Sequence, residues 1–435
     1  MPSPQEREPA RRLLEFIDDS PSPWHAAARI TDALAAAGFV VLDETQAWDL
    51  RPGKGYYLVR GGASVIAFRL GKHPLQGGGL RIIGAHTDSP GLRIKPAGAR
   101  IQGGMAVLGV EVYGAPILAS FADRDLTLAG RVFVQTESGL EERLYRHPSA
   151  LVRLPNLAIH MNRNVNEEGL RFDPQEQLPL ILECSETPQT PSPDRFRERL
   201  AGWLDVPPRS LRSWELVVAD TQPGAFFGPA EEFIASSRLD NLASCHAALE
   251  ALLAVEPAAG VSLIACLDHE EVGSESYQGA AGRFLPDTLE TIRASLGVEP
   301  VALRRELASG WLLSADMAHA YHPNFAAYYD EAHAAQVNAG LVIKLNAKQR
   351  YASDALGDAY VQALCERAGV PWQRYVHRTN LPCGSTIGPI CAARLGLRTV
   401  DIGAPMWSMH SIRESAGAFD HGYMIRALSA FFAEL

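Results

Sequence analysis

The most constraining feature of this 435-residue chain is an apolar run that ends abruptly in acidic residues. The run Val261–Leu267 has the length and apolar character of a buried parallel strand, and Asp268, His269, Glu270 and Glu271 follow it at once. Because side chains alternate faces along an extended strand, two adjacent acids at its end offer one metal ligand and one proton acceptor. An isolated pair of this kind is more typical of a solvated acidic turn, so a metal site at this position needs support from other residues of the chain.

Apolar periodicity elsewhere alternates between strand-like and helix-like segments. Strands are predicted at 80–85, 261–267, 311–315 and 397–402, and helices at 11–19, 22–38, 240–253, 351–368 and 422–435. Such alternation predicts an α/β fold with a mostly parallel sheet.

The amino-acid composition and the apolar periodicity change in the middle of the chain. From about residue 96 to residue 228 the chain is rich in Gly and Val and in short alternating strands, such as 105–113 and 126–135. We therefore expect a discontinuous α/β domain at 1–95 and 229–435, and an inserted β-rich domain at 96–228.

Bulk properties exclude several classes of protein. The formal net charge of −10 argues against nucleic acid as a partner. The six cysteines form no CxxC pair, which is typical of reduced thiols in the cytoplasm. No stretch of about 18 apolar residues predicts a membrane span, and the polar amino terminus does not have the pattern of a secretory signal. We expect a cytoplasmic protein that binds neither membrane nor nucleic acid.

Polar residues follow several of the predicted strands. His86, Glu270, Glu271 and Asp316 come after strand ends, His410 follows the last strand after a short loop, and Asp240 precedes a helix. The carboxyl ends of parallel strands lie along one edge of a sheet, where ligands bind. Residues far apart in the sequence are therefore expected to meet.

The residue types suit a pair of divalent metals. Imidazole and carboxylate together favour zinc, with manganese or cobalt as substitutes. Two ions about 3.5–4 Å apart need one bridging carboxylate and terminal ligands on each side. That count is met by five residues: His86, Asp240, Glu271, Asp316 and His410. Glu270 is left as the proton carrier, and Asp88 is placed to accept the second imidazole N–H of His86.

Each of these residues has a structural alternative when taken alone. A single histidine is more often a core or surface residue than a ligand, Asp240 could cap its helix, and Asp316 could end a strand in a turn. Spacing supports the metal hypothesis only because all of them share one placement in the predicted sheet.

Six segments resemble the aspartyl aminopeptidase family of dinuclear zinc metallopeptidases. They occur in the family's order, cover nearly the whole chain, and lie at 86–90, 237–242, 268–274, 314–319, 382–389 and 409–414. The resemblance implies a zinc-peptidase domain with an inserted dimerisation domain. One departure is His269, where many relatives have Asn.

The resemblance also implies a role for each metal-site residue. His86 and Asp316 would hold one zinc ion, Glu271 and His410 would hold the other, and Asp240 would bridge them. Glu270 would be the general base that takes a proton from the attacking water and delivers it to the leaving amine.

Further family positions imply peptide substrates with an acidic first residue. Lys344 resembles the lysine that meets the substrate carboxylate; spacing alone would make it an exposed strand lysine. His319 resembles a substrate contact. His160 resembles a histidine that reaches a neighbouring subunit's site; the alternatives are a metal ligand or a plain strand histidine. The family's hollow twelve-subunit shell, built from dimers, is the expected assembly.

Three functions follow from these observations. The leading one is an aminopeptidase that removes amino-terminal Asp or Glu. The second is an aminopeptidase of broad or neutral preference on the same two-metal site. The third is a non-catalytic assembly protein that keeps the fold, which the complete set of metal-site residues and Glu270 argues against.

Overall fold

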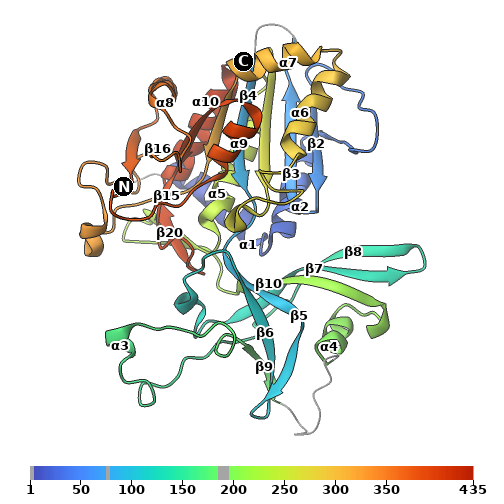
Figure 1. The fold of residues 1–435 in the computed structure, drawn as a ribbon, viewed down its shortest axis with the longest axis vertical. Coiled ribbons are helices and arrows are strands. Elements are labelled where there is room, and N and C mark those ends of the chain that lie inside the picture. Colours follow the sequence, from blue (N-terminus) through green and yellow to red (C-terminus); the bar gives the residue numbers. More distant parts are fainter. Residues whose placement is uncertain (1–3, 75–78, 185–194, 435) are drawn as a thin grey trace. The chain divides into compact units, whose positions relative to one another are not determined.

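The computed structural model describes residues 4–74, 79–184 and 195–434, and the contacts divide the chain into two compact units (Figure 1). The first unit comprises Met1–Asp88, Gly224–Met409 and Glu414–Leu435, and the second comprises Ser89–Pro223 and His410–Arg413. The predicted boundaries at 95/96 and 228/229 fall a few residues later than these. The sequence did not indicate that the short segment His410–Arg413 would group with the second unit.

A nine-stranded sheet forms the centre of the first unit, in the order β1-β2-β3-β13-β4-β14-β18-β16-β17. Its strands are β1 Val40–Val41, β2 Gly55–Arg60, β3 Ser64–Leu70, β4 Leu80–His86, β13 Val261–Leu267, β14 Trp311–Ala315, β16 Leu341–Leu345, β17 Trp372–Val376 and β18 Arg398–Gly403. The four central strands β13, β4, β14 and β18 run parallel, so their carboxyl ends share one edge. The predicted mostly parallel α/β sheet is confirmed.

The two flanks of this sheet depart from the parallel pattern. Strand β3 pairs antiparallel with β13, and β16 pairs antiparallel with β18. Strands β16 and β17 are parallel to each other. The loops that follow these two strands therefore leave the sheet in the direction opposite to that of the central strands.

Helices cover both faces of the sheet (Figure 1). They are α1 Pro4–Asp18, α2 Pro23–Ala36, α5 Leu239–Ala254, α6 Phe284–Ser295, α7 Pro300–Ser309, α8 Ala355–Ala368, α9 Ile387–Leu395 and α10 Asp420–Ala433. Along β4, Ile83 and Ala85 pack in the same cluster as helices α1, α2, α5 and α10, whereas Leu80 and Ile82 pack with α6 and α9. This two-residue alternation explains why most of the strand is apolar.

Local capping signals set two of the helix starts. The side chain of Ser22 accepts a hydrogen bond from the His25 backbone N–H, and Pro23 occupies the first turn of α2, as the sequence predicts. The helix predicted from residue 351 begins instead at Ala355, because the Asp354 side chain accepts from the Gly357 backbone N–H and caps it there.

A smaller five-stranded sheet completes the first unit, in the order β11-β12-β20-β19-β15. Its strands are β11 Ala225–Phe227, β12 Phe233–Ser236, β15 Ala318–His319, β19 Pro405–Trp407 and β20 Glu414–Gly417. Strand β15 follows Asp316 closely and β20 begins at Glu414, so this sheet holds residues next to the ends of the central strands.

The second unit is built on a six-stranded antiparallel sheet in the order β8-β7-β10-β5-β6-β9. Its elements are β5 Gly91–Gln102, β6 Met105–Tyr113, β7 Leu126–Thr136, β8 Gly139–Arg146, α3 Val165–Glu168, β9 Leu180–Cys184, α4 Arg195–Trp203 and β10 Leu211–Asp220. A separate apolar core packs this sheet against α4, through Phe196 and Leu200 of the helix. The unit is β-rich, as the sequence predicts, and its role in dimerisation stays a prediction.

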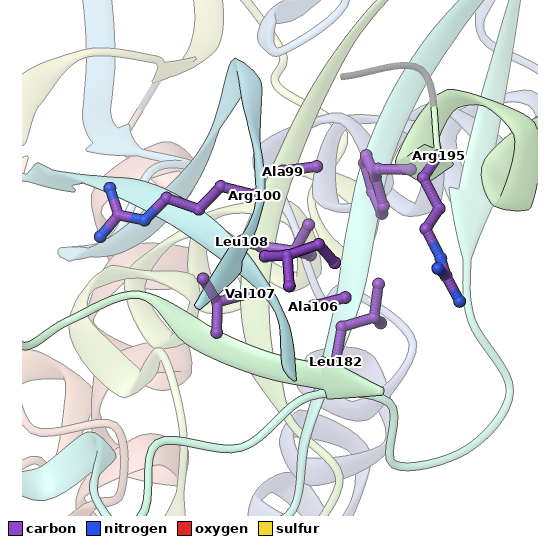
Figure 2. A pocket seen from close by; sticks show the side chains of 9 residues that line it. Ala99, Arg100, Ala106, Val107, Leu108, Leu182 and Arg195 are labelled. Atoms are coloured by element: carbon purple, nitrogen blue, oxygen red, sulfur yellow. The ribbon is translucent and has the colours of Figure 1, made fainter. Parts of the chain in front are cut away.

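Figure 2 shows a small apolar pocket in this second unit. Its walls come from β5, β6, β9 and α4, and they include Ala99, Leu108 and Leu182. The side chains of Arg100 and Arg195 extend away from it (Figure 2). The pocket lacks polar groups converging on its interior, which a specific ligand site requires.

Across residues 4–74, 79–184 and 195–434, none of the helices combines the length and the apolar character that a membrane crossing requires.

Two buried histidines join helices of the first unit. His246 of α5 and His421 of α10 are hydrogen-bonded to each other, with 2.9 Å between Nδ1 and Nε2. Helix α1 contributes Phe16, whose ring lies 5.2 Å from that of His246, and Arg12, which pairs with Glu250 at 2.9 Å. Burial, followed by the charge of Arg12, lowers the pKa of His246 to about 3, and burial lowers the pKa of His421 well below its usual value.

We expect these two histidines to make the protein less stable in acid. A histidine whose folded-state pKa is lowered takes up its proton only in the unfolded chain as the pH falls below about 6.5, so stability is lost from that pH downward. Between pH 7 and pH 5 the loss should reach roughly 4 kcal/mol, about 2 kcal/mol for each histidine. Urea unfolding at both pH values should show a smaller loss in a His246→Leu/His421→Leu variant; equal losses would contradict the prediction.

Candidate metal centre

Three polar segments of the first unit follow neighbouring parallel strands. Strand β4 ends at His86, β13 leads into Asp268–Glu271, and β14 is followed by Asp316. Because β13 and β14 are the two neighbours of β4, these segments leave the sheet side by side. The sheet thus brings together residues that are separated by more than two hundred positions in the sequence.

His86 lies at the centre of this group and is almost completely buried. Its Nδ1 lies 3.0 Å from the backbone carbonyl oxygen of Asp88, so Nδ1 carries the proton and donates. Its Nε2 then presents a lone pair toward carboxylate oxygens of Asp240 at 3.4 Å and Asp316 at 3.6 Å. A lone pair that faces two carboxylates requires a proton or a cation between them.

The pKa of His86 reflects the same crowding. Burial opposes a charged imidazole, but the contacts with Asp240, Asp316 and Asp88 together outweigh it and raise the pKa well above its usual value. In the absence of a metal, a proton on His86 would offset part of the negative charge.

Asp88 has a different main contact from the one the sequence suggested. Its carboxylate oxygens accept hydrogen bonds from the backbone N–H groups of Glu270 and Glu271, each at 3.1 Å. The same carboxylate lies 3.5 Å from His86 Nδ1, which is farther than the Asp88 backbone carbonyl. Asp88 therefore holds the turn that carries the two glutamates, and its main chain orients the imidazole.

Asp240 lies in the first turn of α5 with non-helical backbone angles. Asn241 is also non-helical, so the regular part of α5 begins after these two residues. The Asp240 backbone N–H donates to the buried carboxylate of Glu414 at 3.1 Å, and the amide of Asn241 donates to the Ala315 carbonyl at 2.8 Å. These bonds fix the start of α5 against β14 and leave the Asp240 carboxylate facing His86.

Potential ligand atoms converge in two overlapping sets within this unit. Nitrogen and carboxylate oxygen atoms of His86, Asp240 and Asp316 lie within 4.8 Å of one another, and so do those of His86, Glu270 and Glu271. Both glutamates thus lie within 4.8 Å of His86, and Glu271 also lies within this limit of Asp240.

The charges of this cluster suit a divalent metal. Burial raises the pKa of Glu270 to about 8, with further raising by Asp316, Asp88 and Asp240 against an opposing effect of His86. Burial, followed by the charge of Asp240, raises the pKa of Glu271 well above its usual value. Several carboxylates crowd around one imidazole, and divalent cations would offset that charge. The donor set of imidazole and carboxylate is the one that zinc accepts.

Two predicted site residues belong to the second unit. His410 has a left-handed backbone, and its Nδ1 lies 3.1 Å from the carbonyl oxygen of Ala115. His160 is exposed in a turn rather than in a strand, so the plain-strand alternative is wrong. Among the described residues His160 joins no group of potential metal ligands.

The two other predicted substrate contacts lie beside Asp316. Lys344 is fully buried, so the exposed-lysine alternative is wrong. Its Nζ donates to the carbonyl oxygens of Asp316 at 3.0 Å and Met317 at 3.2 Å, and lies 3.4 Å from the Asp316 carboxylate. His319 packs against Tyr375, with 5.7 Å between ring centroids, and burial lowers the pKa of His319 to about 4.

Sequence reasoning assigned no role to Glu414 or to the side chain of Asp268. Glu414 is nearly inaccessible and binds the Asp240 main chain. Asp268 accepts from its neighbour His269 and from the side chain of Gln278. The available signal was their position within the segments 409–414 and 268–274, which already marked them as neighbours of predicted ligands.

Comparison with known proteins identifies close relatives over nearly the whole chain. Residues 16–432 match the family described as "Aminopeptidase I zinc metalloprotease (M18)". The "Probable M18 family aminopeptidase 2" of Ectopseudomonas mendocina is 44% identical over 425 residues, which cover 97% of each chain.

Solved structures show the same fold. A chain in the "Cryo-EM structure of the Ape4 and Nbr1 complex" matches with a TM-score of 0.94 and 35% identity, over 98% of this chain and 86% of that one. The "Structure of S. cerevesiae mApe1 dodecamer" matches with a TM-score of 0.85 and 27% identity, over 98% and 96% of the two chains.

Proposed function

The chain belongs to the M18 family of zinc metalloproteases and is a metalloaminopeptidase, and from this premise we propose that it removes amino-terminal Asp or Glu residues from peptides. The observation that carries the proposal is the buried cluster of His86, Asp240 and Asp316 with Glu270 and Glu271 beside it. A structural cluster would not require this number of crowded carboxylates around one imidazole.

The proposed site holds two zinc ions, with manganese or cobalt as substitutes. His86 and Asp316 would hold one ion, Glu271 and His410 would hold the other, and Asp240 would be the ligand that both share. The two contacts of His86 Nε2, with Asp240 and Asp316, support the first ion. The family pattern at 409–414 supports His410 as the ligand that completes the second.

Glu270 is the proposed proton carrier. Zinc, when bound, supplies an acidified water and polarises the carbonyl oxygen of the scissile bond. Glu270 accepts the proton of the attacking water and delivers it to the leaving amine. The backbone N–H of Glu270 is held by Asp88, which keeps the carboxylate of this residue in position. Burial also shifts the pKa of Glu270 toward neutrality, where a proton carrier works in both directions.

Three outcomes of a hydrolysis assay separate the candidate functions. Peptides that begin with Asp, Glu or Leu are offered to the zinc-loaded protein, with and without a chelator. Faster release of Asp and Glu supports the proposal, and equal or faster release of Leu supports an aminopeptidase of broad or neutral preference. No release from any peptide would support a non-catalytic assembly protein.

Lys344 is the proposed partner of the acidic first residue. Replacing it in Lys344→Met should lower kcat/KM for an Asp substrate about tenfold more than for a Leu substrate, because a charged hydrogen bond is lost only with Asp. The kcat/KM for both substrates should fall to some extent, since Lys344 also binds the Asp316 main chain. The exposed Lys72→Met is the matched control, and equal losses with both substrates would contradict the assignment.

We also propose assembly into a homo-oligomeric shell of twelve subunits, with His160 reaching a neighbouring subunit's site. A similar protein of known structure is described as a dodecamer. Three large apolar side chains beside His160 are exposed in the second unit: Leu157, Ile159 and Met161. Exposed apolar clusters of this kind mark protein contacts. Light scattering should give a mass near twelve chains, and a monomer would contradict the proposal.

A further inference from the structure

A solvent-facing cavity of about 330 Å³ lies in the first unit, between the loops that follow β16 and β17. One wall comes from residues 346–350 and the other from residues 376–383. Because β16 and β17 are adjacent parallel strands, the loops at their carboxyl ends face each other.

The lining of this cavity is basic in an acidic protein. Lys348, Arg350 and Arg378 line it and are exposed, and no Asp or Glu belongs to the lining. Within residues 4–74, 79–184 and 195–434, none of the three pairs with a carboxylate within 4.0 Å. The chain as a whole carries a net charge of −10, so cations left unpaired around one cavity point to an anionic ligand.

The walls of the cavity are held in place by hydrogen bonds. The Arg350 carbonyl oxygen accepts from the Ser385 hydroxyl at 3.1 Å, which ties the first loop to the segment before α9. On the second loop, the hydroxyl of Tyr375 lies 2.7 Å from Nδ1 of His377. The arginines therefore extend from anchored loops, as a binding site requires.

The cavity lies next to His319, one of the proposed substrate contacts. His377 lines it, and the ring centroid of His377 lies 6.0 Å from that of His319. His319 lies on β15, which closely follows Asp316, one of the candidate metal ligands. A peptide that contacts His319 would therefore lie next to this cavity.

We propose that this cavity binds a carboxylate of the peptide substrate on the carboxyl-terminal side of the scissile bond. The inference rests on the proposed function. Guanidinium groups match carboxylates through paired N–H donors, and Arg350 and Arg378 offer two such groups. A side-chain carboxylate and the carboxyl terminus of a short peptide carry the same chemistry, and either would fit a cavity of this size.

The test compares four substrates that share an amino-terminal Asp. They are an Asp anilide without any downstream carboxylate, a tripeptide Asp-Ala-Ala, its carboxyl-terminal amide, and the amide of Asp-Ala-Glu. Each is assayed with the zinc-loaded wild-type protein and with the Arg350→Gln and Arg378→Gln variants. Arg394→Gln is the matched control, because Arg394 is exposed in the same unit and does not line the cavity.

Loss of either cavity arginine should lower kcat/KM about tenfold for substrates with a downstream carboxylate and leave the anilide unchanged. A loss with Asp-Ala-Ala alone identifies the carboxyl terminus as the ligand, and a loss with the Asp-Ala-Glu amide alone identifies the side chain. The wild-type advantage of the charged substrates should shrink as salt is added, since exposed charges are screened.

Two results would overturn the proposal. One is equal kcat/KM for variant and wild-type proteins on every substrate. The other is an equal loss on the anilide and on the peptides, which would place the cavity at the first residue instead. Wild-type turnover of the anilide is the separate test of the aminopeptidase itself, so the failure of the cavity proposal is distinguishable from the failure of the proposed function.

Discussion

Replacing Glu270 with Gln should lower kcat by about a factor of 10²–10⁴ for every peptide substrate. The substitution keeps the size of the side chain but removes its ability to accept a proton from water. The backbone bond from Glu270 to Asp88 does not involve the side chain, so the turn should persist. The measurement is kcat on an Asp peptide, with zinc content determined on the same sample.

The zinc content is needed to interpret this result, because Glu270 and Glu271 both lie within 4.8 Å of His86 and either could be a ligand. If Glu270 is the proton carrier, Glu270→Gln keeps its zinc and loses its turnover. If Glu270 is instead a ligand, zinc is lost together with activity. Glu275→Gln is the control, since Glu275 is an exposed acid of the same loop. Wild-type turnover in Glu270→Gln with full zinc would remove the residue from the mechanism.

Removing the metal should have a comparably large effect. Chelation of the wild-type protein should lower activity by at least about 10³, because the attacking water then keeps its ordinary acidity. The thermal unfolding midpoint should fall as well, since the crowded carboxylates of Asp240, Glu270 and Glu271 lose the cations that offset their charge. Activity and midpoint are measured before chelation, after it, and after zinc is returned.

Recovery of activity after zinc is returned shows whether chelation removed a catalytic metal or irreversibly unfolded the protein. Full recovery of both activity and midpoint supports a site that forms reversibly in the folded chain. Undiminished activity in a sample shown by elemental analysis to contain no metal would contradict the proposed chemistry.

The elements that position the site were readable from local patterns. The predicted runs Val261–Leu267 and Trp311–Ala315 coincide with β13 and β14. Every residue of both strands is buried, and all but Ser262 and Ser314 are apolar, because helices cover both faces of the sheet. A short apolar run was therefore a reliable signal. Strands β2 and β3 escaped prediction; they lie at the antiparallel flank, where no polar ligand follows a strand end.

Several candidate site residues could likewise be selected from the sequence. His86, Glu270, Glu271 and Asp316 were selected because each follows a predicted strand, and the structure brings them together at the carboxyl ends of β4, β13 and β14. The sequence pattern could not predict which atoms of these side chains would form which hydrogen bonds. Asp88 was expected to bind His86 through its carboxylate, which lies 3.5 Å from His86 Nδ1 and also accepts hydrogen bonds from the backbone of Glu270 and Glu271.

The sequence by itself determined the four central strands, their apolar character and the kinds of side chain placed at their ends, because periodicity and residue type are local properties. Only the tertiary structure decided the order of the nine strands and the reversal of β16 and β17, since pairing between distant segments depends on how the whole core packs. That packing buries Lys344 beside Asp316 and sets Arg350 and Arg378 around one cavity. Their positions follow from contacts between segments that no local window contains.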